Sequence, residues 1–148
     1  MIQRKQTIFL ILALGVVVAC MMLPVGRFEP EGMGTGAAMT NLFVVRQPLS
    51  WTVSMFVVLL LTCPLTLWAI FAYKNRKFQA KLCTVNIVLL LVWVLLFCIS
   101  GFVIGIDKMT FHPAFAACLP AVAIILQLMA RRGIIADEKL VRSADRIR

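Results

Sequence analysis

Asp107 and His112 are the side chains best suited to acid–base chemistry, and Met109 forms an M-x-x-H pair with His112. Thioether and imidazole groups are ligands that suit copper, and Met33 and Met39 lie in an earlier connection. His112 is the sole histidine, so one chain cannot bind a haem from both sides or build a three-ligand zinc site. The simpler interpretation is that His112 marks the start of the helix that follows.

Ionisable residues avoid the long apolar parts of the sequence. All six acids and all fifteen lysines and arginines lie outside four apolar stretches. Ion- and proton-coupled transporters usually place such groups inside the membrane, so this distribution argues against coupled transport. No P-loop, dinucleotide fingerprint or nucleophile elbow is present. The sequence therefore predicts no catalytic residue, no cofactor and no metal site.

The five cysteines fall in apolar runs without a C-x-x-C pair. This pattern favours small buried side chains over a redox centre or a disulfide framework. Residues 17–20 resemble a lipoprotein cleavage box, which would make Cys20 a lipidated terminus. We expect an uncleaved first helix instead.

Four apolar stretches are the elements that position the remaining residues. The sequence is 62% hydrophobic and 14% charged, with a mean hydropathy of +0.99, far from a soluble domain. Each stretch is near the roughly 20 residues that a helix needs to cross hydrocarbon, and none alternates like a barrel strand. They span about residues 7–23, 51–72, 82–104 and 111–130. We predict an all-α, polytopic membrane protein in one domain (1–148), a four-transmembrane-helix bundle running up-down-up-down with an outer loop at 24–50 and a tail at 131–148.

The basic residues predict the orientation of these spans. Twelve of the fifteen lie in the first terminus, the second connection and the tail. The positive-inside rule then places both termini in the cytoplasm. Basic side chains beside the inner leaflet attract anionic lipid, by about 1 kcal/mol each. The predicted lipid contacts are Lys74, Arg76, Lys77, Lys81, Arg131 and Arg132. This location also explains the net charge of +9 without nucleic acid, because stacking aromatics are not interleaved with the charge.

A few side chains within the spans have predicted structural roles. We expect Asn86 and Gln127 to make hydrogen bonds between helices. Trp93 lies in mid-span and is expected to face a neighbouring helix. Pro64 and Pro120 predict bends in the second and fourth helices.

The outer loop and the tail contain two further apolar patterns. Residues 42–45 form an apolar stretch that is interpreted as a strand, a lid or a partner patch, and we expect it to pack on the protein's own outer face. Gly133 predicts the end of the fourth helix. Residues 134–148 then show one apolar stripe, with Glu138 and Arg142 spaced as an ion pair. We predict an interfacial helix on the inner leaflet, with a solvated tail as the alternative.

The two ends of the chain carry the most distinctive sequence. Residues 1–8 and 137–148 resemble the ends of a bacterial family of small four-helix membrane proteins, domain-of-unknown-function family 4293. The resemblance implies a bacterial inner-membrane location and four spans, and no activity. Since both ends are predicted to be cytoplasmic, we expect them to meet in one polar cluster that closes the inner end of the bundle or binds a partner. Its members are Gln3, Arg4, Gln6, Arg142, Asp145 and Arg146.

Three functional hypotheses remain after these exclusions. The first is a non-catalytic accessory or scaffold subunit that binds another membrane protein or a second copy of the chain, suggested by the cytoplasmic cluster and by spans of low polarity. The second is a small oligomeric transporter or channel for a neutral or apolar solute, suggested by the two proline positions. The third is a membrane enzyme acting on lipid, for which only Asp107 with His112 would be suitable.

Overall fold

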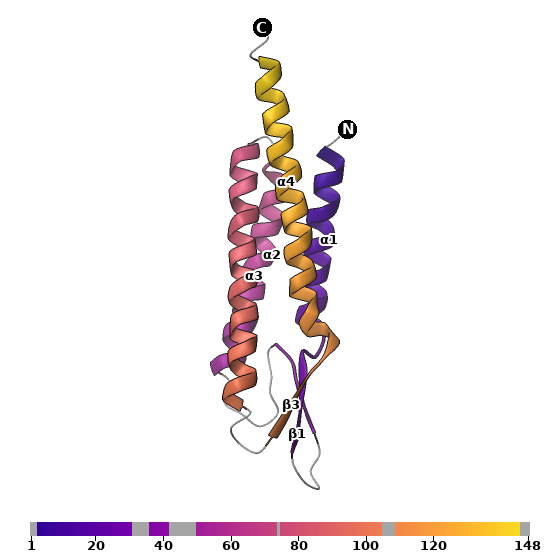
Figure 1. Cartoon of the computed structure of the whole chain (residues 1–148), viewed down its shortest axis with the longest axis vertical. Coiled ribbons are helices and arrows are strands. Elements are labelled where there is room, and N and C mark those ends of the chain that lie inside the picture. Colours follow the sequence, from indigo (N-terminus) through magenta and orange to yellow (C-terminus); the bar gives the residue numbers. More distant parts are fainter. Residues whose placement is uncertain (1–2, 31–35, 42–49, 74, 105–108, 146–148) are drawn as a thin grey trace.

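A computed structural model describes residues 3–30, 36–41, 50–73, 75–104 and 109–145 of the chain. Four helices lie side by side along the long axis, and three short strands lie at one end (Figure 1). The helices are α1 (Gln3–Met22), α2 (Ser50–Phe71), α3 (Arg76–Ile104) and α4 (Leu119–Asp145). The strands are β1 (Gly26–Pro30), β2 (Ala37–Met39) and β3 (Met109–Pro113), and a short 3-10 helix, η1 (Phe115–Cys118), precedes α4.

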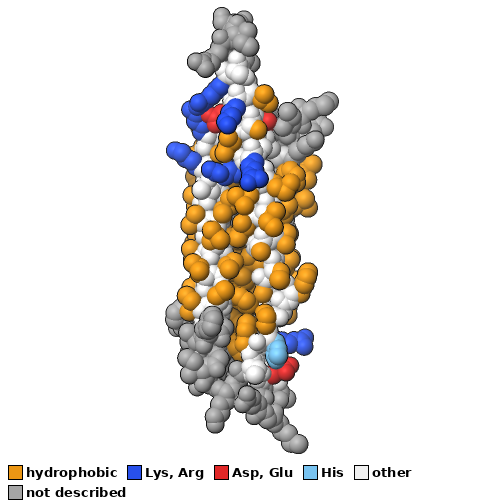
Figure 2. Space-filling model, viewed as in Figure 1, with side chains coloured by type: hydrophobic (Ala, Val, Ile, Leu, Met, Phe, Trp, Pro, Cys, Tyr) orange, Lys and Arg blue, Asp and Glu red, His pale blue; other side chains and the backbone are white. Residues whose placement is uncertain are grey.

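Three of the four helices are long and apolar enough to cross a membrane. These are α2, α3 and η1 with α4, whereas α1 contributes a shorter apolar helix, Gln6–Met22. Apolar side chains cover the middle of the molecule in the view of Figure 2, and charged side chains lie toward its two ends. This distribution fits a hydrocarbon environment around the middle of the helices.

A small polar layer links three helices inside this apolar body. Thr66 of α2 accepts hydrogen bonds from the amide of Asn86 on α3 at 3.1 Å and from that of Gln127 on α4 at 3.4 Å. The Thr66 hydroxyl donates to the carbonyl oxygen of Thr62. All four side chains are buried. The predicted role of the two amides in bonding between helices is confirmed.

The strands form an antiparallel sheet in the order β2-β1-β3. In β1, Gly26 and Phe28 are buried whereas Arg27 and Glu29 are exposed, as the period-two geometry of a strand requires. Phe28 lies opposite Phe111 of β3, with ring centroids 5.0 Å apart. One face of the sheet thus continues the apolar core beyond the end of the helices.

Aromatic rings and one asparagine join the sheet to the helices. Phe111 contacts Phe97 of α3, which stacks on Trp93 at 5.4 Å. The indole of Trp93 donates to Asn41, and the amide of Asn41 donates to the carbonyl oxygen of Cys20 near the end of α1. Because all these polar groups are buried, Asn41 both caps α1 and holds the chain after β2 against α3.

The structure differs from the prediction mainly outside the first two helices. The all-α description is wrong, because a sheet is present; its strands are too short to give a long alternating pattern. His112 lies in β3, so the fourth helix begins at Leu119 and not near residue 111. Pro120 is therefore in the first turn of α4, where its missing N–H breaks no hydrogen bond of the α-helix. Pro64 is inside α2. Residues 42–45 lie outside the described residues.

The third and fourth helices are also longer than predicted. α3 starts at Arg76 instead of residue 82, because charged and amide side chains at the membrane boundary do not oppose helix formation. α4 continues through Gly133 to Asp145, so the predicted helix end at Gly133 is wrong. A glycine there is tolerated because α1 approaches closely: a Cβ on Gly133 would lie 3.1 Å from Cγ of Gln6.

Candidate functional site

Most of the described basic residues lie at one end of the helices, which we call the charged end. It contains the start of α1, the connection between α2 and α3 and the second half of α4 (Figure 1). Lysine and arginine side chains gather at this end in the view of Figure 2. At the opposite end the exposed ionisable side chains include Arg27, Glu29 and His112. The basic residues described at the charged end are Arg76, Lys77, Lys81, Arg131, Arg132, Lys139 and Arg142.

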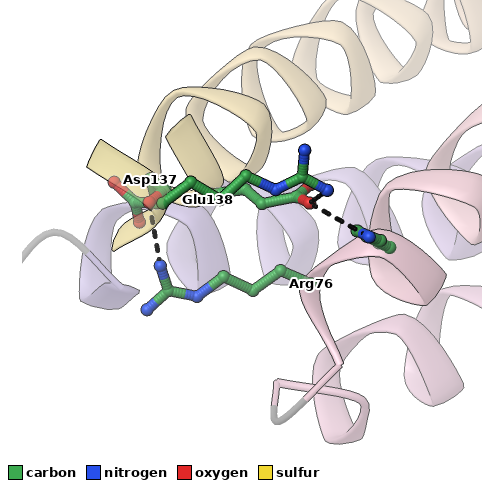
Figure 3. Close-up of polar contacts among 5 residues, drawn as sticks. Arg76, Asp137 and Glu138 are labelled. Atoms are coloured by element: carbon green, nitrogen blue, oxygen red, sulfur yellow. Dashed lines mark hydrogen bonds and ion pairs between the residues drawn. The ribbon is translucent and has the colours of Figure 1, made fainter. Parts of the chain in front are cut away.

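A buried contact between α1 and α4 organises the centre of the charged end. The side-chain amide of Gln6 donates to the carboxylate of Asp137, and both side chains are buried. Arg76, at the start of α3, donates to the backbone carbonyl of Asp137 at 3.1 Å (Figure 3). Three helices thus meet at Asp137. A buried carboxylate needs such donors, since an unpaired charge in this position would be strongly disfavoured.

A second, more exposed set of charges lies one residue further along α4. Glu138 pairs with Arg142 at 2.9 Å, which confirms the predicted pair on the tail. Lys77 of α3 approaches the same carboxylate at 3.9 Å. In Figure 3 the contacts of the Glu138 carboxylate lie apart from the contact between Arg76 and Asp137. These exposed pairs are worth less than about 1 kcal/mol each, so they orient charge more than they stabilise the fold.

Two hollows flank these contacts. The first, which we call the α1–α2 cleft, has a volume of about 520 Å³ and is lined by Gln6, Ile8, Ile70, Tyr73, Arg76 and Gln79. The second, the α3–α4 groove, has a volume of about 380 Å³ and is lined by Lys77, Lys81, Ile135, Glu138, Lys139 and Arg142. Both hollows lie beside the apolar middle part of the helices, which we call the apolar band, and both are lined by positively charged side chains.

The comparison with known families agrees with the resemblance noted at the ends of the chain. A model described as Domain of unknown function (DUF4293) matches residues 2–147. The chain belongs to the DUF4293 family. The match spans nearly the full sequence and assigns no activity to any residue of this DUF4293 chain. No curated protein matches it.

The structure brings together most of the residues predicted to contact lipid. Arg76, Lys77 and Lys81 lie on the first turns of α3, and Arg131 with Arg132 lies on the adjacent part of α4. Lys74 lies outside the described residues. In the described part of the DUF4293 chain, Nε of Arg131 is buried without a hydrogen-bond partner.

The predicted cytoplasmic cluster is only partly described. Gln6 is buried and bonds to Asp137, so it closes the end of the bundle and is not part of an exposed surface. Arg142 is exposed on α4. Gln3, Arg4 and Asp145 lie in helices, but their side chains are outside the described part, and Arg146 is outside it altogether.

Of the residues considered for metal or acid–base chemistry, His112 and Met39 have described side chains, and these two lie apart. His112 is exposed on β3, 3.9 Å from Glu29, whereas Met39 is buried on β2, on the other side of β1. Asp107 and Met33 lie outside the described residues. Within the described ranges, no group of three or more histidine, cysteine or acidic side chains is placed to hold a metal. Cys20 and Cys83 are buried, as predicted, whereas Cys98 and Cys118 are exposed on the apolar band.

Sequence reasoning missed Asp137 and Gln79. Asp137 was assigned to a separate tail because Gly133 was read as a helix end. The spacing of Ala130, Ile134 and Asp137 continues one helical face and would have placed the carboxylate toward α1. Gln79 follows Arg76 at a spacing of three, so both point to one side of α3 once that helix is known to begin at residue 76.

Proposed function

We propose that this DUF4293 protein is a non-catalytic accessory or scaffold subunit of the bacterial inner membrane that binds another membrane protein. Both termini and the charged end face the cytoplasm in this proposal. The helices form the membrane-embedded body, and the second half of α4 presents the partner surface. The partner in this proposal is embedded in the same membrane.

The projecting part of α4 carries the proposal. α4 extends beyond the other helices at the charged end (Figure 1). Leu140 is 60% exposed and Val141 is 47% exposed on this segment, next to the charged residues Lys139 and Arg142. Apolar side chains of this size beyond the apolar band are costly in water and are typical of helix-in-groove contacts. The segment continues along the bundle axis and does not turn aside at Gly133, which fits a partner contact better than an interfacial helix.

Purification of tagged protein in a mild detergent, followed by mass spectrometry, tests the partner. One membrane protein is expected to co-purify with the tagged wild-type chain in a fixed ratio. It is expected to be absent from the preparation of the Leu140→Ser variant. Leu95→Ser is the matched control, because Leu95 is 62% exposed within the apolar band and distant from the projecting segment. Recovery of the wild-type chain always alone and monomeric would contradict the proposal.

The proposed orientation follows from the charge distribution and the positive-inside rule. Single cysteines are introduced at Lys77, on the charged end, and at Thr110, exposed on β3, in a chain whose native cysteines are replaced by alanine. An impermeant maleimide added to intact cells is expected to label the Thr110→Cys chain, and the Lys77→Cys chain only after permeabilisation. The reverse pattern overturns the orientation.

The transporter hypothesis loses one of its two supports, because Pro120 lies in the first turn of α4, where a proline does not break the hydrogen bonds of the helix. The polar layer around Thr66 is buried and is bonded between helices. A liposome flux assay with neutral solutes is expected to show no uptake above empty vesicles, and clear uptake would favour transport over a scaffold role.

A further inference from the structure

The α1–α2 cleft combines apolar and polar walls at the boundary of the apolar band. Ile8 and Ile70 supply apolar surface, whereas Tyr73, Arg76 and Gln79 supply polar groups. Its volume of about 520 Å³ lies within the range of about 300–1,000 Å³ that is typical of small-molecule sites. α1 packs more extensively on α4 than on α2, so the cleft lies at the looser of the two seams of α1.

Two polar groups in the cleft are suited to contact a phosphate. Gln79 lines the cleft and is 5% exposed. Its side-chain amide carries two N–H groups that can donate to an anion there. Arg76 uses one N–H for the backbone carbonyl of Asp137 and forms no ion pair with any described acid. Its guanidinium therefore keeps a full positive charge and further donors, the combination that binds phosphate.

We propose that the α1–α2 cleft binds one anionic phospholipid. Its phosphate contacts the guanidinium of Arg76 and accepts a hydrogen bond from the amide of Gln79, while an acyl chain follows Ile8 and Ile70. Tyr73 is placed at the rim, where its hydroxyl reaches the headgroup. The site deepens the proposed function, because it rests on a membrane location with the charged end at the inner leaflet, where anionic lipid is concentrated.

The α3–α4 groove is the natural comparison. It contains more basic residues, but Glu138 pairs with Arg142 and approaches Lys77, so part of its charge is already compensated. The polar side chains lining it are exposed or only partly buried. We expect diffuse attraction of lipid at this groove and a defined contact at Arg76. A comparison of the two hollows therefore distinguishes a defined lipid site from non-specific attraction of lipid by basic side chains.

Native mass spectrometry of the detergent-solubilised full chain tests the site. Phosphatidylglycerol and phosphatidylcholine are titrated separately, and the fraction of chain retaining one lipid is measured. Wild type is expected to prefer phosphatidylglycerol, and Arg76→Gln is expected to weaken its retention at least about tenfold, as expected for one lost charge-assisted contact. Lys81→Gln removes one positive charge from the α3–α4 groove and is expected to change retention less than about twofold.

Gln79→Glu provides a second variant of nearly the same shape. It places a negative charge in the cleft and is expected to abolish the preference for phosphatidylglycerol. Circular dichroism and protection of the buried thiols show whether the variant is folded. Equal losses in Arg76→Gln and Lys81→Gln, or equal retention of the two lipids by wild type, would overturn the site. The purification and maleimide-labelling experiments test the scaffold proposal and the orientation by other measurements. A failure of either proposal is therefore distinguishable from a failure of the lipid site.

Discussion

The hydrogen bond between Gln6 and Asp137 allows a quantitative test of the charged end. Both side chains are buried, and the amide of Gln6 is the donor that the structure shows for the Asp137 carboxylate. Gln6→Ala removes that donor and leaves a buried charge with less compensation. Hydrogen bonds to charged groups contribute about 1.5–3 kcal/mol, so we expect the free energy of unfolding to fall by that amount. Asp137→Ala leaves the amide unpaired, with an expected loss of about 1–3 kcal/mol.

The double variant separates this bond from the loss of packing. Once one partner is absent, removal of the other costs little more, so the two losses are expected to be less than additive by about 1.5–3 kcal/mol. A chain of this size loses about 2–4 °C of melting temperature per kcal/mol, so each single variant is expected to melt roughly 2–12 °C lower. Additive losses in the double variant would refute the inference that the two side chains bond directly.

Unfolding is followed in detergent with a fluorogenic maleimide. Cys20 and Cys83 are fully buried and react only when the fold opens, whereas the exposed Cys98 and Cys118 give a constant baseline. Ser143→Ala is the control, because this exposed hydroxyl bonds only within its own helix, and a change below about 0.5 kcal/mol is expected.

Three further variants test other contacts in the same assay. Thr66→Val removes the hydroxyl that two buried amides share and is expected to lower the free energy of unfolding by about 1–2 kcal/mol. The control Thr84→Val loses only an exposed hydrogen bond within its own helix and is expected to be nearly neutral. Equal effects of the two substitutions would contradict a role for the polar layer. Gly26→Ala places a Cβ 2.5 Å from the ring of Phe111, which contacts the rings of Phe28 and Phe97. We expect the free energy of unfolding to fall by about 1–3 kcal/mol. An unchanged melting temperature would show that the ring moves freely. Gly133→Leu is expected to separate α4 from α1 and to lower stability by at least about 1 kcal/mol, and a more stable variant would show that the close approach is not needed.

The helical part of the fold could be predicted because hydrocarbon imposes one strong requirement on long uncharged stretches. α2 was predicted almost to its ends, since both flanks change from apolar to polar within a few residues. The bonds of Asn86 and Gln127 between helices followed from the same requirement, because an amide inside the bundle must find a partner there.

The sheet was not predicted, for reasons that concern particular residues. Residues 111–113, the second half of β3, fall in the predicted fourth span because Phe111 begins a largely apolar run, and hydropathy does not distinguish a strand from a helix over so few residues. The alternation of Gly26, Arg27, Phe28 and Glu29 was a usable signal that the length of the surrounding loop obscured. Pairing between β1 and β3 depends on helix packing and is invisible in local sequence.

The candidate site was predicted in composition and not in geometry. The basic side chains of the charged end were identified from charge alone, and five of the six predicted lipid contacts are found together in its described part. Their division into a compensated groove and a cleft with an uncompensated arginine could not be predicted. It depends on where α3 begins and on the direction of Arg76, which only the packed helices determine.

The pairing of β1 with β3 links segments that are made early and late in synthesis. α1 finds its most extensive contact on α4, and Asn41 holds the end of α1 against Trp93 of the third helix. Since α1 is synthesised before α4, it is fully packed only after α4 has been made. A chain interrupted after α3 retains the α2–α3 hairpin but has neither the contact between α1 and α4 nor a complete sheet.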